Sequence, residues 1–158
     1  MTMKEKGAPM SLESGPALNP ADDALAAQIL KILRSMRSVA VVGASERPGR
    51  PSHRVTFYLI RAGFEVFPVN PALRELGGRP AYPDLRAIPA RIDVVDIFRR
   101  PEAVMPVVEE AISVGAGAIW MQEGVVNEEA AARARAAGLA VVMDRCIMKE
   151  HRKMVGKG

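Results

Sequence analysis

The sequence predicts an α/β domain with a Rossmann-like, doubly wound parallel sheet of about five strands and helices on both faces. Three observations lead to this prediction. Short segments are apolar along their whole length, as expected for strands that are buried on both sides. Segments with helical periodicity or helix-capping residues separate most of them. The chain has 158 residues, which is enough for one domain with a substantial core.

The expected strands are the apolar segments bounded by turn residues. They cover residues 38–44 (SVAVVGA), 64–70 (FEVFPVN), 92–98 (IDVVDIF), 117–122 (GAIWMQ) and 139–144 (LAVVMD). Right-handed crossovers between parallel strands would bring all of their carboxyl ends to one edge of the sheet. Ligands of such sheets bind at that edge.

Helix signals precede the first strand and fill most of the connections. Asn19-Pro20 is a typical helix start, and a helix should follow Pro51. A third helix is expected over about 101–114, where Pro106 either kinks it or marks its true start. A fourth, alanine-rich helix should run from Asn127 to near Gly138. Residues 71–91 carry Pro and Gly with little periodicity and are expected to be irregular.

The expected organisation is a single domain between two flexible ends. Residues 1–18 lack periodicity and are predicted to form a flexible tail. Residues 19–150 form the domain, and residues 151–158 are predicted to form a flexible C-terminal tail. We find no internal repeat and no second domain.

Composition excludes several classes of function. The net charge is +4 and aromatic residues make up 4%, and no basic-aromatic motif is present, so nucleic-acid binding is not expected. One cysteine and two histidines leave no internal disulfide, no cysteine-based zinc site and no metal cluster. A signal peptide and a membrane helix are not expected, because no long apolar run occurs. The predicted location is the cytoplasm.

A loop rich in phosphate-binding residue types follows the first expected strand. Gly43 permits a tight turn and the close approach of a ligand. Backbone amides and the N-terminus of the following helix can donate to phosphate oxygens, and arginine binds phosphate as a fork. The residues that contribute are Gly43, Ala44, Ser45, Arg47, Arg50, Pro51, Ser52 and Arg54. Each alone fits a turn or a solvated surface, but together they predict a phosphate site.

Missing motifs narrow the identity of the phosphate ligand. The loop is not G-x-G-x-x-G, and the second strand ends in Asn70-Pro71 rather than in the acid that binds the ribose of NAD. NADP fits slightly better, because Arg74 can meet a 2′-phosphate. The P-loop lysine is also absent, which disfavours ATP hydrolysis.

Side chains at the other strand ends are expected to share one rim. Phe98, Arg99, Trp120 and Gln122 follow or end three different strands. Aromatic rings there can stack on a ligand, and an amide can bind its polar groups. Taken singly, each aromatic residue fits ordinary packing against neighbouring loops equally well or better.

These residues together resemble the small stand-alone CoA-binding proteins, which are similar to the CoA-binding domain of the succinyl-CoA synthetase alpha subunit. The matching stretches are VAVVGAS, RPSHRV, GFEVFPVNP, DVVDIFRRPEAV, AIWMQEGVVNEEAA and GLAVVMDRC. They occur in the right order over about residues 38–146. The resemblance implies that the protein binds coenzyme A (CoA) or an acyl-CoA.

The resemblance also implies a role for each matched position. Gly43, Ala44 and Ser45 would contact the pyrophosphate, helped by Arg50 and Ser52. Asn70-Pro71 would border the adenosine, and Arg74 would meet the 3′-phosphate. Phe98 and Arg99 would flank the adenine or ribose. Trp120, Gln122 and Gly124 would lie along the path of the pantetheine arm.

We expect a binding protein rather than an enzyme, because no complete catalytic set is visible. The phosphorylated histidine and the partner subunit used by the synthetase have no counterpart in this chain, and Asp93 and Asp96 fit strand-end polarity better than acid–base chemistry. Cys146 lies on the expected rim, where Arg145 could lower its pKa. It fits a small buried residue better than a thiol that reacts with CoA.

Two alternative functions remain open from sequence. One is an NADP-linked oxidoreductase-like domain, and the other is a protein-interaction module with a vestigial nucleotide groove. The expected partner is a small molecule, CoA or acyl-CoA. A homo-oligomer or an unknown protein partner is also possible from sequence.

Overall fold

The computed structural model describes residues 19–157 and contains the predicted parallel sheet. Its five strands lie in the order β2-β1-β5-β6-β7, and all neighbouring pairs are parallel. The strands are β1 (Ser38–Val42), β2 (Glu65–Val69), β5 (Val94–Ile97), β6 (Ala118–Met121) and β7 (Ala140–Val142). This confirms the predicted fold class. The expected tail over residues 1–18 lies outside the described residues.

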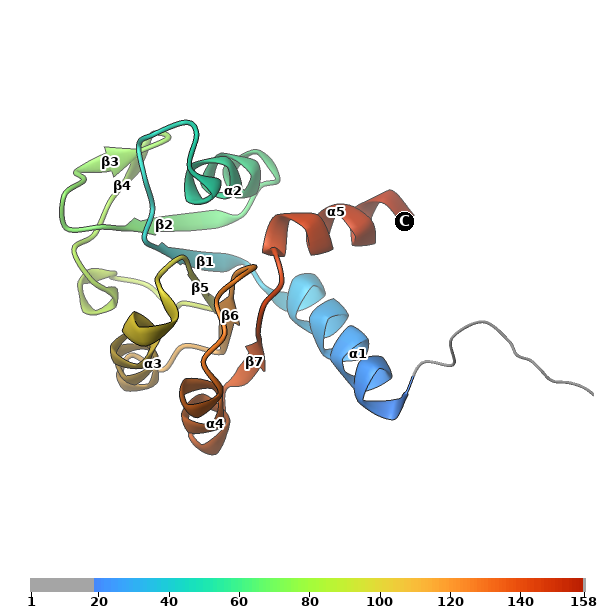
Figure 1. The fold of residues 1–158 in the computed structure, drawn as a ribbon. Helices are drawn as coiled ribbons and strands as arrows, with labels where there is room; N and C mark the ends of the chain where they lie inside the picture. The colour runs from blue at the N-terminus through green and yellow to red at the C-terminus, as the bar shows by residue number, and fades with distance from the viewer. Residues whose placement is uncertain (1–18, 158) are drawn as a thin grey trace, which may run out of the picture.

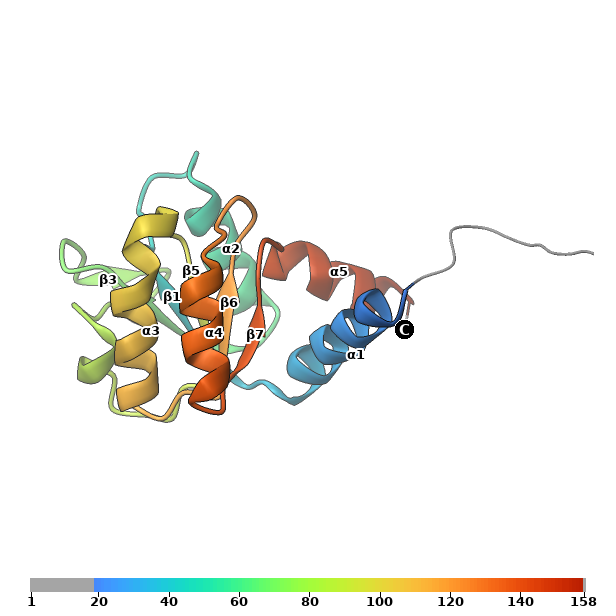
Figure 2. The same cartoon turned by 60° about the horizontal axis from the view of Figure 1, so that its bottom comes forward.

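Helices cover both faces of the sheet. On one face lie α1 (Pro20–Ser35), α2 (Pro51–Arg61) and α5 (Ile147–Lys157), and on the other lie α3 (Val104–Ser113) and α4 (Glu128–Ala136). Figure 1 shows α2 and α5 on one side of the strands, and Figure 2 shows α3 and α4 side by side across the opposite face. None of these helices has both the length and the hydrophobicity needed to cross a membrane.

Successive residues of each strand feed two separate cores. In β1, Val39 and Val41 pack beneath α1, α2 and α5, while Ala40 and Val42 pack beneath α3 and α4. All residues of β1, β5 and β6 are buried. This explains why these strands are apolar throughout and show no alternation in the sequence.

The helix starts follow the local chemistry of the sequence. Asn19 caps α1, with its side-chain oxygen accepting from the Asp22 amide at 2.9 Å. Asn127 caps α4 in the same way, accepting from the Ala130 amide at 2.9 Å. Pro106 is the third residue of α3, where its missing amide hydrogen costs no helical bond. It therefore marks a helix start rather than a kink.

The segment expected to be irregular contains a small hairpin. Strands β3 (Glu75–Leu76) and β4 (Arg79–Pro80) pair antiparallel, and a 3₁₀ turn follows at Leu85–Ala87. Tyr82 then bridges to Val69 and covers the β2 edge of the sheet. Two-residue strands are too short to produce a periodic sequence signal.

The C-terminus corrects the expected domain boundary. Residues 151–157 of the predicted tail are instead the second half of α5, which continues to Lys157. His151 is buried in this helix, and its Nδ1 lies 2.6 Å from the Tyr58 hydroxyl of α2. The domain therefore extends beyond residue 150, because α5 packs against α2. The segment is rich in charged residues, so the few side chains that make this contact are difficult to recognise in the sequence.

Candidate functional site

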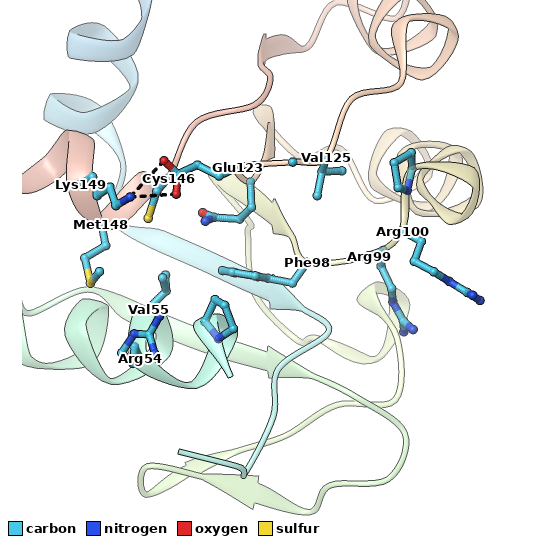
Figure 3. Close-up of a pocket in the computed structure, with 14 residues that line it drawn as sticks. Arg54, Val55, Phe98, Arg99, Arg100, Glu123, Val125, Cys146, Met148 and Lys149 are labelled. Atoms are coloured by element: carbon cyan, nitrogen blue, oxygen red, sulfur yellow. Dashed lines mark hydrogen bonds and ion pairs between the residues drawn. The ribbon is translucent and has the colours of Figure 1, made fainter. Parts of the chain in front are cut away.

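A pocket of about 500 Å³ opens at the carboxyl edge of the sheet. Its walls come from α2, the loop after β5, the turn after β6 and the start of α5 (Figure 3). The residues lining it that the sequence predicted are Pro51, Arg54, Phe98, Arg99, Gln122, Gly124 and Cys146. Elements far apart in the chain thus converge as expected for a doubly wound sheet.

Gly43 brings the predicted phosphate loop directly against this pocket. Its φ is +91°, and a Cβ at this position would lie 2.2 Å from the Phe98 carbonyl oxygen. Only glycine tolerates both the backbone conformation and the close approach. Gly43 itself does not line the pocket, but it holds the loop against Phe98, which does.

Hydrogen bonds fix the conformation of the loop. The Asn70 side-chain amide donates to the Ala44 carbonyl at 2.8 Å, and the Arg47 amide donates to the Ser45 hydroxyl at 3.1 Å. The His53 Nδ1 lies 2.9 Å from the Ser45 carbonyl oxygen. Asn70, predicted to border a ligand, therefore braces the loop from the end of β2.

The N-terminus of α2 lies at the same pocket, which Pro51 helps to line. Arg50 occupies the N-cap position without a side-chain cap bond, and Pro51 is the first helical residue. Ser52 does not cap the helix, because it is the second helical residue rather than the N-cap residue. Its side chain is buried, with 4% exposure. An uncapped helix N-terminus carries partial positive charge, which favours an anion. Pro51 has no amide hydrogen, and the His53 and Arg54 amides donate to the Arg50 carbonyl at 3.0 and 3.3 Å, so of the first helical amides only that of Ser52 has no hydrogen bond within residues 19–157. Arg47 and Arg50 are exposed beside it.

The structure places Trp120 away from the pocket. Its side chain is fully buried among the residues packed beneath α1, α2 and α5, and its indole N–H donates to the Arg145 carbonyl at 2.8 Å. The prediction that Trp120 lines the groove is therefore wrong. The indole turns into the core because its large apolar ring gains more from burial there than at the rim.

Pro71 and Arg74 also lie outside the pocket. Both are exposed in the segment after β2. The Arg74 carbonyl accepts from the Ala81 amide at 2.9 Å, next to the β3–β4 hairpin. Their predicted contacts with adenosine and the 3′-phosphate stay predictions.

Gln122 and Cys146 form the inner wall where β6 and α5 meet. The Gln122 side-chain oxygen accepts from the Ile147 amide at 3.1 Å, which joins the turn after β6 to the start of α5. Cys146 is 6% exposed, and its sulfur faces the pocket in Figure 3. This wall therefore combines a polar amide with a buried thiol.

Several lining residues were not among the predicted ones. They are Val55, Arg100, Pro101, Glu123, Val125, Met148 and Lys149. Met148 and Lys149 belong to α5, whose packing was not anticipated. Lys149, which lines the pocket, forms an ion pair with Glu123 at 3.0 Å. Arg100 and Pro101 directly follow Arg99. Their position after the end of β5 was therefore the sequence signal that could have predicted them as lining residues.

Carboxylates near the strands are not positioned for acid–base chemistry in the pocket. Asp96 is fully buried in β5, and its side-chain oxygens have no hydrogen-bond partner among residues 19–157; burial raises its pKa well above the usual range. At the opposite end of the sheet, burial tends to raise the pKa of Asp93, but bonds from the Arg37 and Ser38 amides and from Arg91 lower it overall. Within residues 19–157, no cluster of candidate ligands could hold a metal ion.

Comparison with known proteins identifies the family. The profile of a CoA binding domain family matches residues 37–152. The uncharacterised protein YneT of Bacillus subtilis is 42% identical over 125 residues, covering 79% of this chain and 93% of YneT. A hypothetical protein from Pyrococcus horikoshii is 42% identical, with a TM-score of 0.80 over 83% of this chain and 92% of that one.

A longer relative carries a similar domain. The ADP-forming acetate–CoA ligase II of Archaeoglobus fulgidus is 32% identical over 95 residues, which are 58% of this chain but 14% of the ligase. The resemblance is thus to one part of that enzyme. The profile match and the two small relatives cover most of the folded chain. On these grounds, the chain belongs to the CoA binding domain family.

Proposed function

We propose that the protein binds CoA or an acyl-CoA in the pocket at the carboxyl edge of the sheet and catalyses no reaction by itself. The observation that carries the proposal is the position of this pocket. It is built partly from Pro51 at the uncapped N-terminus of α2 and from Phe98, against which the Gly43 loop packs. A phosphate site and a groove for an extended arm are therefore continuous.

The two ends of the pocket suit the two ends of CoA. Arg99 and Arg100 lie at one end in Figure 3, beside the Phe98 backbone that the Gly43 loop contacts. Cys146 and Met148 lie at the other end and are mainly apolar. Phosphates would bind near the loop and the arginines, and the pantetheine arm would extend toward Cys146.

The chemistry of the lining supports binding without catalysis. The described residues around the pocket include one thiol, and their one carboxylate, Glu123, is engaged by Lys149. Histidine does not occur among them. A nucleophile paired with a general base, the usual requirement for acyl transfer, is not assembled there.

Calorimetric titration with CoA, dephospho-CoA, NAD and NADP tests the proposal. We expect CoA to bind most tightly. An Arg50→Ala, Ser52→Ala double variant should bind CoA about tenfold or more weakly, because a charge-assisted phosphate contact and a helix-terminal contact are lost. Arg135→Ala, an exposed arginine on α4 across the sheet, is the matched control and should bind like wild type.

The pattern of ligands that bind distinguishes the alternative functions. Binding of NADP but not CoA would contradict the proposal and favour an oxidoreductase-like domain. Binding of none of the four would favour a protein-interaction module. Equal loss of CoA affinity in the double variant and in Arg135→Ala would show that only overall charge matters, and would contradict a phosphate site at α2.

A further inference from the structure

A second cavity, of about 420 Å³, lies between α2 and α5 and is strongly cationic. Arg54 and Arg61 contribute from α2, and Arg152 contributes from α5. The other lining residues are His53, Phe57, Tyr58 and Met148. Among these described residues none is acidic, and none of the three arginines forms an ion pair within residues 19–157. Three uncompensated guanidinium groups around one cavity favour an anionic ligand.

The walls of this cavity are held in place before any ligand arrives. The Arg152 guanidinium lies 5.3 Å from the centre of the Tyr58 ring, and the Tyr58 hydroxyl contacts His151. The His53 ring stacks on Phe57 with centroids 4.5 Å apart, while its Nδ1 contacts the Ser45 carbonyl of the phosphate loop. Arg152 is therefore partly positioned in advance, which reduces the freedom it loses when it binds an anion.

The cationic cavity continues from the thiol end of the CoA pocket. Arg54 and Met148 line both cavities. In Figure 3 these two side chains lie at the same end of the pocket as Cys146, away from Arg99 and Arg100. A pantetheine arm that reaches Cys146 would therefore direct an attached acyl group past Met148 into the cationic cavity.

We propose that the cavity between α2 and α5 receives the acyl group of a CoA thioester and binds a carboxylate at its far end through Arg61 and Arg152. This inference rests on the proposed CoA function and names its preferred ligands as CoA thioesters of dicarboxylic acids. Met148 would contact the methylene chain, and the arginines would bind the terminal carboxylate. Neutral acyl groups would leave the guanidinium groups without a partner.

The test compares acyl groups of equal length that differ only in the terminal charge. Calorimetric titrations with CoA, glutaryl-CoA, pentanoyl-CoA, malonyl-CoA and propanoyl-CoA are made at one ionic strength. We expect glutaryl-CoA to bind about tenfold more tightly than pentanoyl-CoA, as for one charge-assisted bidentate contact. Arg152→Gln and Arg61→Gln should each reduce that preference while leaving the affinity for CoA itself unchanged.

Further measurements separate the possible failures. Arg135→Gln controls for the change in net charge, and a melting curve of each variant checks that it is folded. The Arg61 side chain forms no hydrogen bond or ion pair within residues 19–157, so Arg61→Gln tests the proposal even if Arg152→Gln disturbs the Tyr58 contact. A preference for glutaryl-CoA that survives both arginine variants would overturn the inference.

The remaining outcomes are equally distinct. The protein could bind CoA tightly and yet prefer neither glutaryl-CoA over pentanoyl-CoA nor malonyl-CoA over propanoyl-CoA. That result would overturn this inference and leave the proposed function standing. Absence of CoA binding would overturn the proposed function itself. Binding of free glutarate or inorganic phosphate as tightly as glutaryl-CoA would show an independent anion site and overturn the acyl-group assignment.

Discussion

Gly43 is the residue on which the contact between the phosphate loop and the pocket depends. Its positive φ and its closeness to the Phe98 carbonyl leave no room for a side chain. Gly63 shares the positive φ, at +96°, but a Cβ there would meet nothing within 4 Å. The two glycines therefore separate backbone strain from steric overlap.

Gly43→Ala should destabilise the protein more than Gly63→Ala does. Each alanine pays roughly 1–2 kcal/mol for the left-handed backbone, and at residue 43 overlap with Phe98 should add about 1–3 kcal/mol more. Urea unfolding of both variants measures the difference. Equal losses of unfolding free energy would show that the loop moves away from Phe98 at little cost, which would contradict a tight contact.

A second prediction at the scale of one residue concerns Asp96 and the pH dependence of stability. Burial raises its pKa in the folded protein, so the folded state holds this proton more tightly than the unfolded chain does. The resulting stability is complete below the ordinary carboxyl pKa of about 3.9 and is lost as pH rises toward the raised value. Between these two pKa values the loss should approach about 1.4 kcal/mol per pH unit.

Asp96→Asn should remove this pH dependence. We expect its free energy of unfolding, relative to that of wild type, to increase, so that the variant becomes relatively more stable, as the pH rises from about 4 to about 8. Chemical denaturation at several pH values measures the trend, and Glu65→Gln at an exposed position of β2 is the control. A relative stability of Asp96→Asn that stays constant or declines over this range would contradict a protonated, unpartnered carboxyl.

The residues show where sequence reasoning succeeded and failed. Glycine, arginine and a helix start after a strand correctly located the Gly43 loop beside the pocket, because these signals are local. Trp120 was misplaced because an all-apolar strand carries no alternation that shows which face a side chain takes. Asn70 sits at the predicted strand end, but its hydrogen bond to Ala44 depends on tertiary packing.

At the scale of elements, α5 completes both cavities. It supplies Cys146's neighbours Met148 and Lys149 to the pocket and Arg152 to the cationic cavity. Its docking on α2 includes the contact between Tyr58 and His151. Burial lowers the pKa of His151 and so favours the neutral imidazole. A neutral imidazole has one ring nitrogen that can accept a hydrogen bond from the Tyr58 hydroxyl.

Tyr58→Phe should loosen this docking. The change removes one hydroxyl and keeps the ring, so we expect a loss of about 1 kcal/mol in unfolding free energy. Tyr82→Phe is the matched control, because the Tyr82 hydroxyl forms no hydrogen bond within the part of the chain that the structure describes. Denaturant unfolding measures both. An unchanged stability of Tyr58→Phe would show that the hydroxyl exchanges His151 for water without cost.

The central elements were predictable and the C-terminal one was not. Apolar strands and capped helices have strong local signals, which located every strand of the main sheet within a few residues. The second half of α5 is rich in Lys and Arg. Among the described side chains of α5, Ile147 and His151 are buried and Met148, Glu150 and Met154 are partly buried. That spacing is helical, but its content of apolar residues is too low to distinguish packing from a solvated tail.

At the scale of the whole molecule, the pocket depends on the order of the strands rather than on any single motif. Parallel crossovers bring the loops after β1, β5 and β6 and the start of α5 to one edge. Fold class and the location of the site could therefore be predicted together. The cationic cavity could not, since it needs the relative placement of α2 and α5.

Amide chemical shifts of the ¹⁵N-labelled protein during titration with CoA test the proposed binding site most directly. We expect the changes to concentrate in residues 43–54, 98–101, 122–125 and 146–149, around the carboxyl edge of the sheet. Changes confined to the groove between α1 and α5, which is lined by Leu25, Ile29 and Met154 among others, would contradict CoA binding at this edge. So would a spectrum that saturating CoA leaves unchanged.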